Sequence, residues 1–560
     1  MTLKARIAAH HFIVAGLFCM GIAAVAYGAL RVTLSQAALI HVTWVAGVDD
    51  GLRREAEQHY SLALGEQVED RTWAYTLSDL SRTNIRRLVS GELIEETPNI
   101  DRTAFRVGPS ALKRPDPASP PWVPVSLWGM TLLGLFMGLM SISLGLVERA
   151  GAETATGQFD RHPTTKQRLT VQQGLSLLFV VTVMGVCFLA ARSMDLRVDE
   201  QMHYLQIERY IAGNYLTHTT TTGGFHAAAA TVARLTGLSA KEDLRLFVLL
   251  VSGATILLFR ALVRSFEPQA STVRTLQFVF FPLLFPFWFL IYTDIFALMF
   301  LLLAILAFTR RQFHITGILM IVSLVVRQTY IVWVALLGLW TVIVNVAEPL
   351  RQLVKRGTSF CIGLGLFLVF VIVNRGVAVG DRNNHPDMEF HTENVLFMLI
   401  CFFVLFLPLI VSKLPQVARL HPALLVGVPL SSGLLFFGTF RVDHSGNTQW
   451  QDYYIRNAML ESMTSSPVAG VVVSVAIALA VLSLCVIRLR QPAHYLIYPF
   501  AAISVIPFWL IEQRYYMPVF TLFMLFRESA SPRVERALLA TSVVIALYLF
   551  AGVVGGQSFL

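Results

Sequence analysis

Long apolar runs separated by short polar connections dominate this sequence of 560 residues. A helix needs roughly 20 apolar residues to cross a bilayer, and somewhat fewer when it lies inside a bundle. About fifteen spans are therefore expected. They begin near residues 11, 122, 171, 246, 275, 294, 313, 330, 358, 394, 421, 468, 493, 515 and 536. This pattern predicts an all-α polytopic membrane protein.

The composition supports a membrane protein and excludes two other classes. Hydrophobic residues make up 55% of the chain and charged residues only 14%, whereas a soluble domain is about one quarter charged. The net charge of +9 does not indicate a nucleic-acid-binding protein, because the basic residues are spread in pairs between apolar runs. The five cysteines lie in apolar stretches without CxxC spacing, so neither a disulfide framework nor a metal site is expected.

The chain divides into three parts. Residues 1–146 form an N-terminal unit of two spans, whose first apolar run follows Lys4 and Arg6 and is expected to be a retained signal anchor. Between these spans, residues 34–120 form a soluble non-cytoplasmic insert, in which residues 52–67 have helical spacing. Residues 147–170 are a polar cytoplasmic linker, and residues 171–560 are the multi-span body.

Positive charges orient the body. Alternate connections are short and basic, for example Arg310 with Arg311 and Arg488 with Arg490, so we assign them to the cytoplasm. Unusual polar clusters then lie near the opposite ends of the spans. These clusters are Asp195–His203, residues 217–226, Tyr292–Asp294, Arg327–Tyr330, residues 380–385, residues 441–444 and Glu512–Tyr516. Ionisable groups at membrane depth usually line a cavity, and together these clusters predict one site at the lumenal or periplasmic face.

Each cluster also has a structural alternative. Asp294 is suited to cap the helix that follows it, Arg327 to form an isolated ion pair, and Arg514 beside two tyrosines to anchor the chain at the membrane interface. Residues 380–385 also fit a polar turn, and Asp199 with Glu200 fits solvated loop charge. The shared side of all these residues favours a common site.

Carboxylates and arginines at one membrane face match sugar transfer from a lipid-phosphate donor. A carboxylate can act as general base on the acceptor hydroxyl, and arginines can stabilise the departing phosphate. A transporter or flippase is the main alternative, although its charges are more often found at the membrane midplane on broken, repeated helices. A non-catalytic scaffold is a third possibility.

The same residues resemble a known family. The stretch VDEQMHYLQIERYIAGNY, followed by THTTTTGG, resembles the first lumenal loop of the dolichyl-phosphate-glucose alpha-1,2-glucosyltransferases. The resemblance continues in order through residues 292–294, 326–329, 379–385 and 512–515, and covers roughly residues 185 to 530. It implies a GT-C type helical bundle and an inverting transfer from a polyprenyl-phosphate sugar to a lipid-linked glycan. It implies neither a nucleotide sugar nor a further cofactor.

The resemblance also implies roles for individual residues. Asp199 is expected to be the catalytic base, with Glu200 and His203 supporting the acceptor or orienting Asp199. Arg327 and Arg514 are expected to bind the donor phosphate, without a metal ion. The residues expected to line the sugar or acceptor site are Tyr292, Asp294, Gln328, Asp381, Arg382, His385, Glu512 and Tyr515.

Two features depart from the family pattern. The stretch LTHTTTTGGFHAAAA lacks the Asp-Pro that usually precedes the Thr-Thr segment, and residues 1–165 have no counterpart. The family implies the endoplasmic reticulum membrane, whereas the arginine-rich, lysine-poor composition also fits a prokaryotic inner-membrane enzyme. Glucose as the sugar is an expectation taken from the family.

Overall fold

The computed structural model describes residues 38–44, 62–69, 72–77, 105–107, 171–380 and 390–560. Two compact units are distinguished. The larger unit contains the described residues of 171–442 and 449–560 and is a bundle of helices. The smaller unit includes four β-strands and the short helix α17 (Ser445–Thr448).

A four-stranded antiparallel sheet lies in the part of the chain expected to be the soluble insert. Its strands are β1 (Ala38–Trp44), β2 (Leu62–Glu69), β3 (Thr72–Leu77) and β4 (Phe105–Val107), in the order β2-β3-β1-β4. The helical prediction for residues 52–67 is therefore wrong from Leu62 onward, where β2 begins. Strand pairing with β3 decides the conformation there, because short polar stretches carry only a weak local preference.

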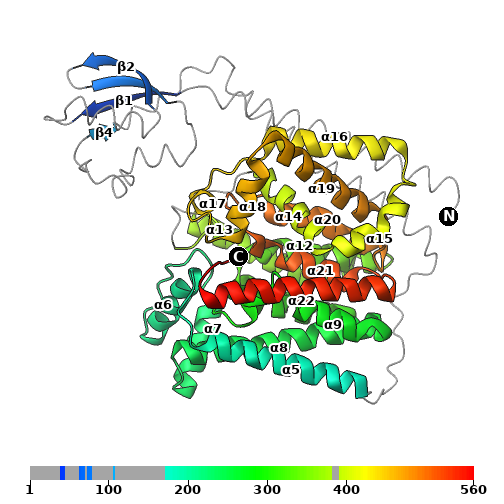
Figure 1. Ribbon diagram of the computed structural model, residues 1–560. Helices are drawn as coiled ribbons and strands as arrows, with labels where there is room; N and C mark the ends of the chain where they lie inside the picture. Colours follow the sequence, from blue (N-terminus) through cyan, green and yellow to red (C-terminus); the bar gives the residue numbers. More distant parts are fainter. Residues whose placement is uncertain (1–37, 45–61, 70–71, 78–104, 108–170, 381–389) are drawn as a thin grey trace. The chain divides into compact units, whose positions relative to one another are not determined.

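Helices that run largely side by side form the larger unit (Figure 1). They are α5 (Val171–Arg192), α6 (Asp199–Ile211), α7 (Gly224–Thr236), α8 (Lys241–Phe266), α9 (Ser271–Val279), α10 (Thr293–Thr309), α11 (Phe313–Val326), α12 (Ile331–Val344), α13 (Leu350–Asn374), α14 (Thr392–Leu405), α15 (Leu407–Val417), α16 (Pro422–Thr439), α18 (Ile455–Thr464), α19 (Pro467–Val486), α20 (Ile497–Val505), α21 (Met517–Phe526) and α22 (Pro532–Gly555). Short 3₁₀ turns precede several of them: η2 (Pro268–Ala270), η3 (Pro286–Trp288), η4 (Gln328–Tyr330), η5 (Pro492–Leu496) and η6 (Gln513–Tyr516).

The polytopic membrane fold is confirmed, but fewer helices are full-length spans than the apolar runs predict. Among the described residues, α8, α13, α16, α19 and α22 are long and apolar enough to cross a membrane, and the bent pair α14–α15 gives a sixth candidate. The expected runs near residues 11 and 122 lie outside the described residues. Most of the other runs fold into shorter helices, because polar residues and prolines end them early.

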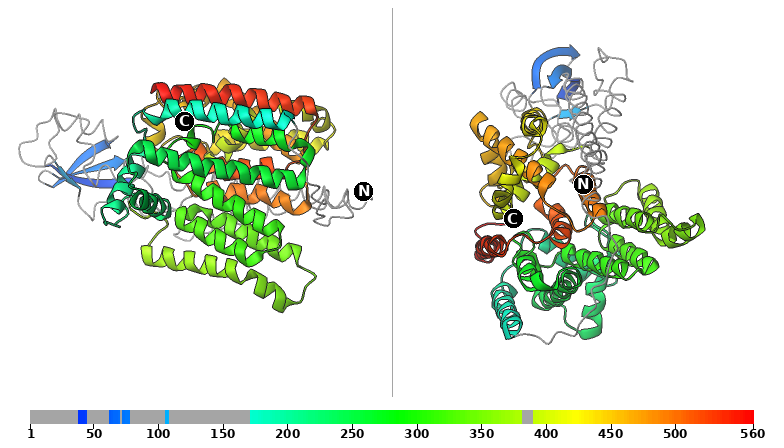
Figure 2. Two further views of the ribbon diagram at one scale, coloured as in Figure 1. Left: turned by 90° about the horizontal axis from the view of Figure 1, so that it is seen from below. Right: turned by 90° about the vertical axis from the view of Figure 1, so that its right-hand side faces the viewer.

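Lipid exposure is clearest for α13. This helix lies at the edge of the bundle in both views of Figure 2 and contacts mainly α11 and α12. Its apolar side chains Leu366, Leu368, Val369, Ile372 and Val373 are exposed. In a bilayer these side chains face lipid tails, as expected of a peripheral transmembrane helix.

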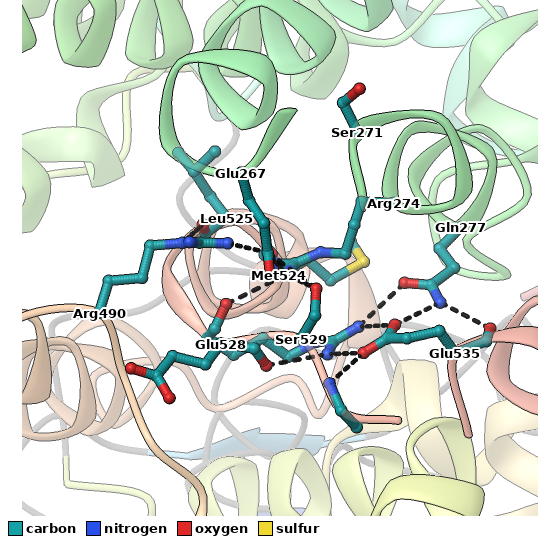
Figure 3. Close-up of polar contacts among 12 residues, drawn as sticks. Glu267, Ser271, Arg274, Gln277, Arg490, Met524, Leu525, Glu528, Ser529 and Glu535 are labelled. Atoms are coloured by element: carbon teal, nitrogen blue, oxygen red, sulfur yellow. Dashed lines mark hydrogen bonds and ion pairs between the residues drawn. The ribbon is translucent and has the colours of Figure 1, made fainter. Parts of the chain in front are cut away.

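A buried polar network fixes one end of the bundle (Figure 3). The Arg527 guanidinium, after α21, makes two parallel bonds of 2.6 and 2.7 Å to the carboxylate of Glu535 on α22. Gln277 on α9 joins both of them, and Arg274 pairs with Glu267 at 3.1 Å. Arg274 and Arg527 are both buried and paired. These two arginines therefore join α9, α21 and α22.

Candidate active site

Four predicted side chains line one pocket where several helices begin or end. Asp294 is the second residue of α10, Arg327 follows the end of α11, and Arg514 and Tyr515 lie in η6 before α21. The open pocket encloses about 310 Å³ of empty space. Its other lining residues are Thr329, Tyr330, Trp333, Ser504, Phe508 and Pro518. The pocket therefore combines two guanidinium groups and a carboxylate with aromatic walls.

Extended backbone at helix starts explains why these side chains meet. Tyr292, Arg327 and Glu512 each have extended φ and ψ angles, and each directly precedes a helix or a 3₁₀ turn. Such a residue stops the preceding helical segment and leaves the next polar side chain in the first turn of the following one. The sequence clusters are therefore the points at which the apolar runs are interrupted.

Asp199 lies beside this pocket through an ion pair with Arg514. Its Oδ2 accepts a hydrogen bond of 2.7 Å from Nη2 of Arg514. The Asp199 side chain remains 46% exposed, so a substrate can still reach it. Burial raises the pKa of Asp199, but the charge and hydrogen bond of Arg514, helped by the more distant charge of Arg456, outweigh burial and hold that pKa below its ordinary value. The carboxylate is thus ionised at neutral pH and able to accept a proton.

Arg514 is itself held from two sides. Glu512 lies 3.4 Å from its Nε, and the Tyr292 ring lies 5.1 Å from its guanidinium carbon in a cation–π contact. The Tyr292 hydroxyl donates to the backbone oxygen of Arg197 at 3.2 Å. Tyr292 and Glu512 were predicted to bind the sugar or acceptor. In the structure both are buried and both contact Arg514.

Arg327 pairs with Asp294 in the pocket wall. Nη1 of Arg327 donates to Oδ1 of Asp294, and the Tyr515 ring lies 6.0 Å from the guanidinium carbon of Arg327. The other carboxylate oxygen of Asp294, Oδ2, is buried without a hydrogen-bond partner. Buried polar atoms are normally paired, so this oxygen is available to a substrate hydroxyl. Arg327, predicted to bind the donor phosphate, thus lies beside Asp294 and Tyr515, which were predicted to line the sugar or acceptor site.

Glu200, predicted to support the acceptor or to orient Asp199, is enclosed by groups of the protein. Its carboxylate accepts two bonds, of 2.9 and 2.7 Å, from Arg245 of α8, and both side chains are fully buried. The backbone nitrogens of Ile291 and Arg197 each donate a further bond of 3.0 Å. All of its acceptor capacity is used within the protein. Glu200 therefore joins α6 to α8 and to the segment before α10.

Gln328 was predicted to line the sugar or acceptor site, and in the structure its amide bonds to the backbone of two segments. Its Oε1 accepts from the backbone nitrogen of Thr222 at 3.1 Å, and its Nε2 donates to the oxygens of Thr220 and Val377 at 2.7 and 3.1 Å. With all of these bonds made, the amide links two loops. The linked segments are the Thr-rich stretch before α7 and the residues that follow α13. Asp381, Arg382 and His385 lie outside the described residues.

Two buried histidines, one on α6 and one on α7, contact each other close to Asp199. Nδ1 of His203 is 3.0 Å from Nε2 of His226, which sequence reasoning did not single out as a site residue. Its position beside the conspicuous Thr-Thr-Gly-Gly stretch was the one available signal. Burial lowers the pKa of His203 to about 4, with Asp199 opposing and Arg514 reinforcing the shift. Burial and His203 hold the pKa of His226 well below its ordinary value. Both rings are therefore neutral at pH 7.

This pair predicts a loss of stability in mild acid. A histidine whose folded pKa is lowered takes up its proton more readily in the unfolded chain, so stability falls as pH drops from about 6.5 toward about 4. We expect His203 to contribute up to about 3 kcal/mol of this loss. Unfolding in detergent, followed between pH 7 and 4.5, measures it. The His203→Asn variant should show a shallower pH slope, whereas a variant of the exposed His314 should keep the wild-type slope. Equal slopes for wild type and His203→Asn would contradict the interpretation.

Known proteins match the part of the chain that contains this pocket. A sequence profile of the DIE2/ALG10 family matches residues 194–352 and 339–525. A relative from Debaryomyces hansenii, named Dol-P-Glc:Glc(2)Man(9)GlcNAc(2)-PP-Dol alpha-1,2-glucosyltransferase, is 31% identical over 273 residues, which is 41% of this chain and 57% of the relative. No solved structure matches this chain.

Two further relatives carry the same name. The one from Candida albicans is 28% identical over 144 residues, covering 22% of this chain and 31% of the relative. The one from Kluyveromyces lactis is 27% identical over 233 residues, covering 34% and 41%. In each case the match spans less than two thirds of the relative's length.

Proposed function

This chain belongs to the DIE2/ALG10 family, and on that premise we propose that it is a membrane glucosyltransferase. It moves glucose from a polyprenyl-phosphate donor to a hydroxyl of a lipid-linked glycan. The relatives are named as using Dol-P-Glc and an acceptor of the type Glc(2)Man(9)GlcNAc(2)-PP-Dol. The observation that carries the proposal is the pocket itself, where Arg327, Arg514 and Asp294 meet beside Asp199.

The reaction is a single displacement at the anomeric carbon of the donor sugar. Asp199 accepts the proton of the acceptor hydroxyl as the acceptor oxygen forms its bond to that carbon. On the other face of the carbon, the bond to the phosphate oxygen breaks and polyprenyl phosphate leaves with one additional negative charge. Attack opposite the leaving group inverts the configuration. Since Arg514 contacts Asp199 and also lines the pocket, one side chain connects the base with the phosphate site.

The arginines stabilise the charge that develops on the leaving phosphate. Arg327 is buried and Arg514 is partly buried. Each guanidinium is already oriented by a carboxylate. Preorganised donors of this kind lower the transition-state energy because they need no rearrangement during the reaction. Asp294 offers its unpaired Oδ2 to a hydroxyl of the sugar. The active site then faces the lumen or the periplasm, depending on the organism.

A transporter or flippase is the alternative that the charged residues also allow. Such proteins usually place their charges at the midplane, on broken helices of repeated halves. Here Asp199, Asp294, Arg327 and Arg514 lie at helix ends and around one pocket. This arrangement favours the transferase.

The direct test is a transfer assay. Protein purified in detergent is incubated with polyprenyl-phosphate glucose and a lipid-linked oligosaccharide that carries two glucose residues, and the product is identified by its mass. The proposal predicts a mass gain of one hexose on the acceptor. Binding of both lipids without any hexose transfer would overturn it.

Two substitutions of Arg327 should distinguish the contribution of its charge to catalysis from that of its forked geometry. We expect Arg327→Gln to lower kcat by about 10²- to 10³-fold, because a preorganised donor to the leaving phosphate is lost and Asp294 loses its partner. Arg327→Lys keeps the charge without the forked geometry and should retain more activity. Steady-state kinetics with varied donor measure both effects. A variant of Arg375, which lies outside the pocket, is the matched control and should transfer glucose at the wild-type rate.

A further inference from the structure

The C-terminal segment, residues 557–560, packs against the residues that support the active site. Helix α22 ends at Gly555, and Gly556 adopts a left-handed conformation with φ +67°, which lets the chain turn away from the helix axis. The segment then pairs with the start of α18. The backbone nitrogen of Phe559 donates to the oxygen of Tyr453, and the nitrogen of Ile455 donates to the oxygen of Phe559, both at 2.8 Å. The chain end and α18 lie at the same end of the bundle in Figure 1.

The side chain of Phe559 is buried among aromatic rings. It is 2% exposed, and its ring centroid lies 6.2 Å from Phe287, 6.4 Å from Tyr292 and 6.2 Å from Tyr454. Tyr292 is the ring that also contacts the guanidinium of Arg514. Phe559 therefore supports the aromatic residue on which Arg514 rests.

A chain of polar contacts connects the segment with Asp199. Nη1 of Arg456 donates to the backbone oxygen of Leu560 at 3.0 Å and to Oε2 of Glu512 at 2.5 Å. Glu512 in turn lies 3.4 Å from Arg514, which binds Asp199 at 2.7 Å. Arg456 and Glu512 are both buried. Each charged side chain in this row of contacts is paired with the next one. Displacing one side chain therefore changes the position of its neighbour.

We propose that residues 557–560 are a positioning element of the active site, which acts through Arg456, Glu512 and Tyr292 on the ion pair of Arg514 with Asp199. The assignment rests on the proposed function for the roles of Arg514 and Asp199. With the segment in place, Arg456 is held by Leu560 and shares the charge of Glu512. When the segment is displaced, Arg456 loses its backbone acceptor and Arg514 loses the support of Tyr292. Arg514 then turns toward Glu512 and away from the base.

The test is a double-mutant cycle with kinetic readout. Phe559→Ala is expected to lower kcat by about 10- to 100-fold, because small displacements of a catalytic group are costly, while the donor KM changes by less than about threefold. Phe559→Leu keeps a large apolar side chain at this buried position and should retain most of the activity that Phe559→Ala loses. Arg456→Gln should lower kcat similarly, and the double variant with Phe559→Ala should be no more than about threefold worse than Arg456→Gln alone.

Phe550→Ala is the matched control. Phe550 lies on α22, is buried, and packs on Phe285 and Phe289. Its loss should destabilise the protein comparably to Phe559→Ala, yet leave kcat within about threefold of wild type and combine additively with Arg456→Gln in free energy. The proposal is overturned if Phe559→Ala keeps wild-type kcat, or if its effect multiplies with that of Arg456→Gln.

Amide hydrogen exchange separates this proposal from the proposed function. In ligand-free protein, Phe559→Ala should speed exchange in peptides that cover residues 197–203 and 512–516, and Phe550→Ala should not. If wild type transfers no glucose but this exchange pattern is found, the segment still positions the site and the glucosyltransferase assignment falls. If wild type transfers glucose and the exchange at these peptides is unchanged, the positioning role falls alone.

Discussion

Asp199→Asn is expected to lower kcat for sugar transfer by about 10³-fold or more, since a general base typically contributes 10²- to 10⁴-fold and the acceptor oxygen here must lose its proton as it attacks. The amide keeps the size of the side chain but cannot accept the proton. Its oxygen can still accept a hydrogen bond from Arg514, so the protein should fold and bind donor normally. Single-turnover transfer measures the loss, and thermal unfolding in detergent verifies the fold.

Asp195 provides the control for this variant. It lies four residues before Asp199, and its carboxylate is 92% exposed, with Lys241 at 3.9 Å. Asp195→Asn removes the same charge from the same segment and should leave kcat within about threefold of wild type. Full transfer activity in Asp199→Asn would remove Asp199 from the mechanism, whatever the control shows.

Glu200→Gln should have the opposite phenotype, with loss of folding stability as the primary effect. The substitution leaves Arg245 buried without its ionic partner, and breaking a buried pair in this way costs about 3–5 kcal/mol. The amide nitrogen of Gln would also face Arg245 or the backbone donors of Ile291 and Arg197. The free energy of unfolding in detergent, or the yield of folded protein, measures the effect.

Two further variants show whether the cost comes from the buried charge. Glu208→Gln changes an exposed residue of the same helix and should leave stability within about 0.5 kcal/mol of wild type. The double variant Glu200→Leu with Arg245→Met removes both charges but leaves the backbone partners of both side chains unpaired. It should therefore recover only the part of the lost stability that comes from the unpaired buried charge. If Glu200→Gln is as stable as wild type but inactive, then Glu200 acts on the substrate and the structural assignment is wrong.

The general architecture could be read from the amino-acid sequence with little else. Apolar runs define membrane helices because burying backbone and apolar side chains in lipid leaves few other choices. Among the described residues, fewer of these runs form full-length helices than expected, since composition alone does not show which runs stop after three or four turns. The sheet in the N-terminal part was missed because its strand β1 pairs with β3 and β4, which both lie much further along the chain.

The candidate site was predicted as a set of residues, and only partly as a set of roles. Polar clusters that interrupt apolar runs identify Asp294, Arg327, Arg514 and Tyr515, and the structure brings these four together in one pocket. Gln328 and Tyr292 occur in the same motifs, but their polar groups bind the backbone. His226 and Arg456 carried no strong signal, because each becomes relevant only through a partner far away in sequence.

Asp199 and Glu200 show where the sequence stops being informative. As adjacent carboxylates at the start of one helix, they have the same local context, and the sequence determined only that acidic groups follow an apolar run at one end of the bundle. Successive residues of a helix point about 100° apart. One carboxylate therefore reaches Arg514 at the open pocket, while the other is enclosed by Arg245. Which acid can accept a proton from a substrate is decided by tertiary packing, because burial and full hydrogen bonding remove Glu200 from contact with any ligand.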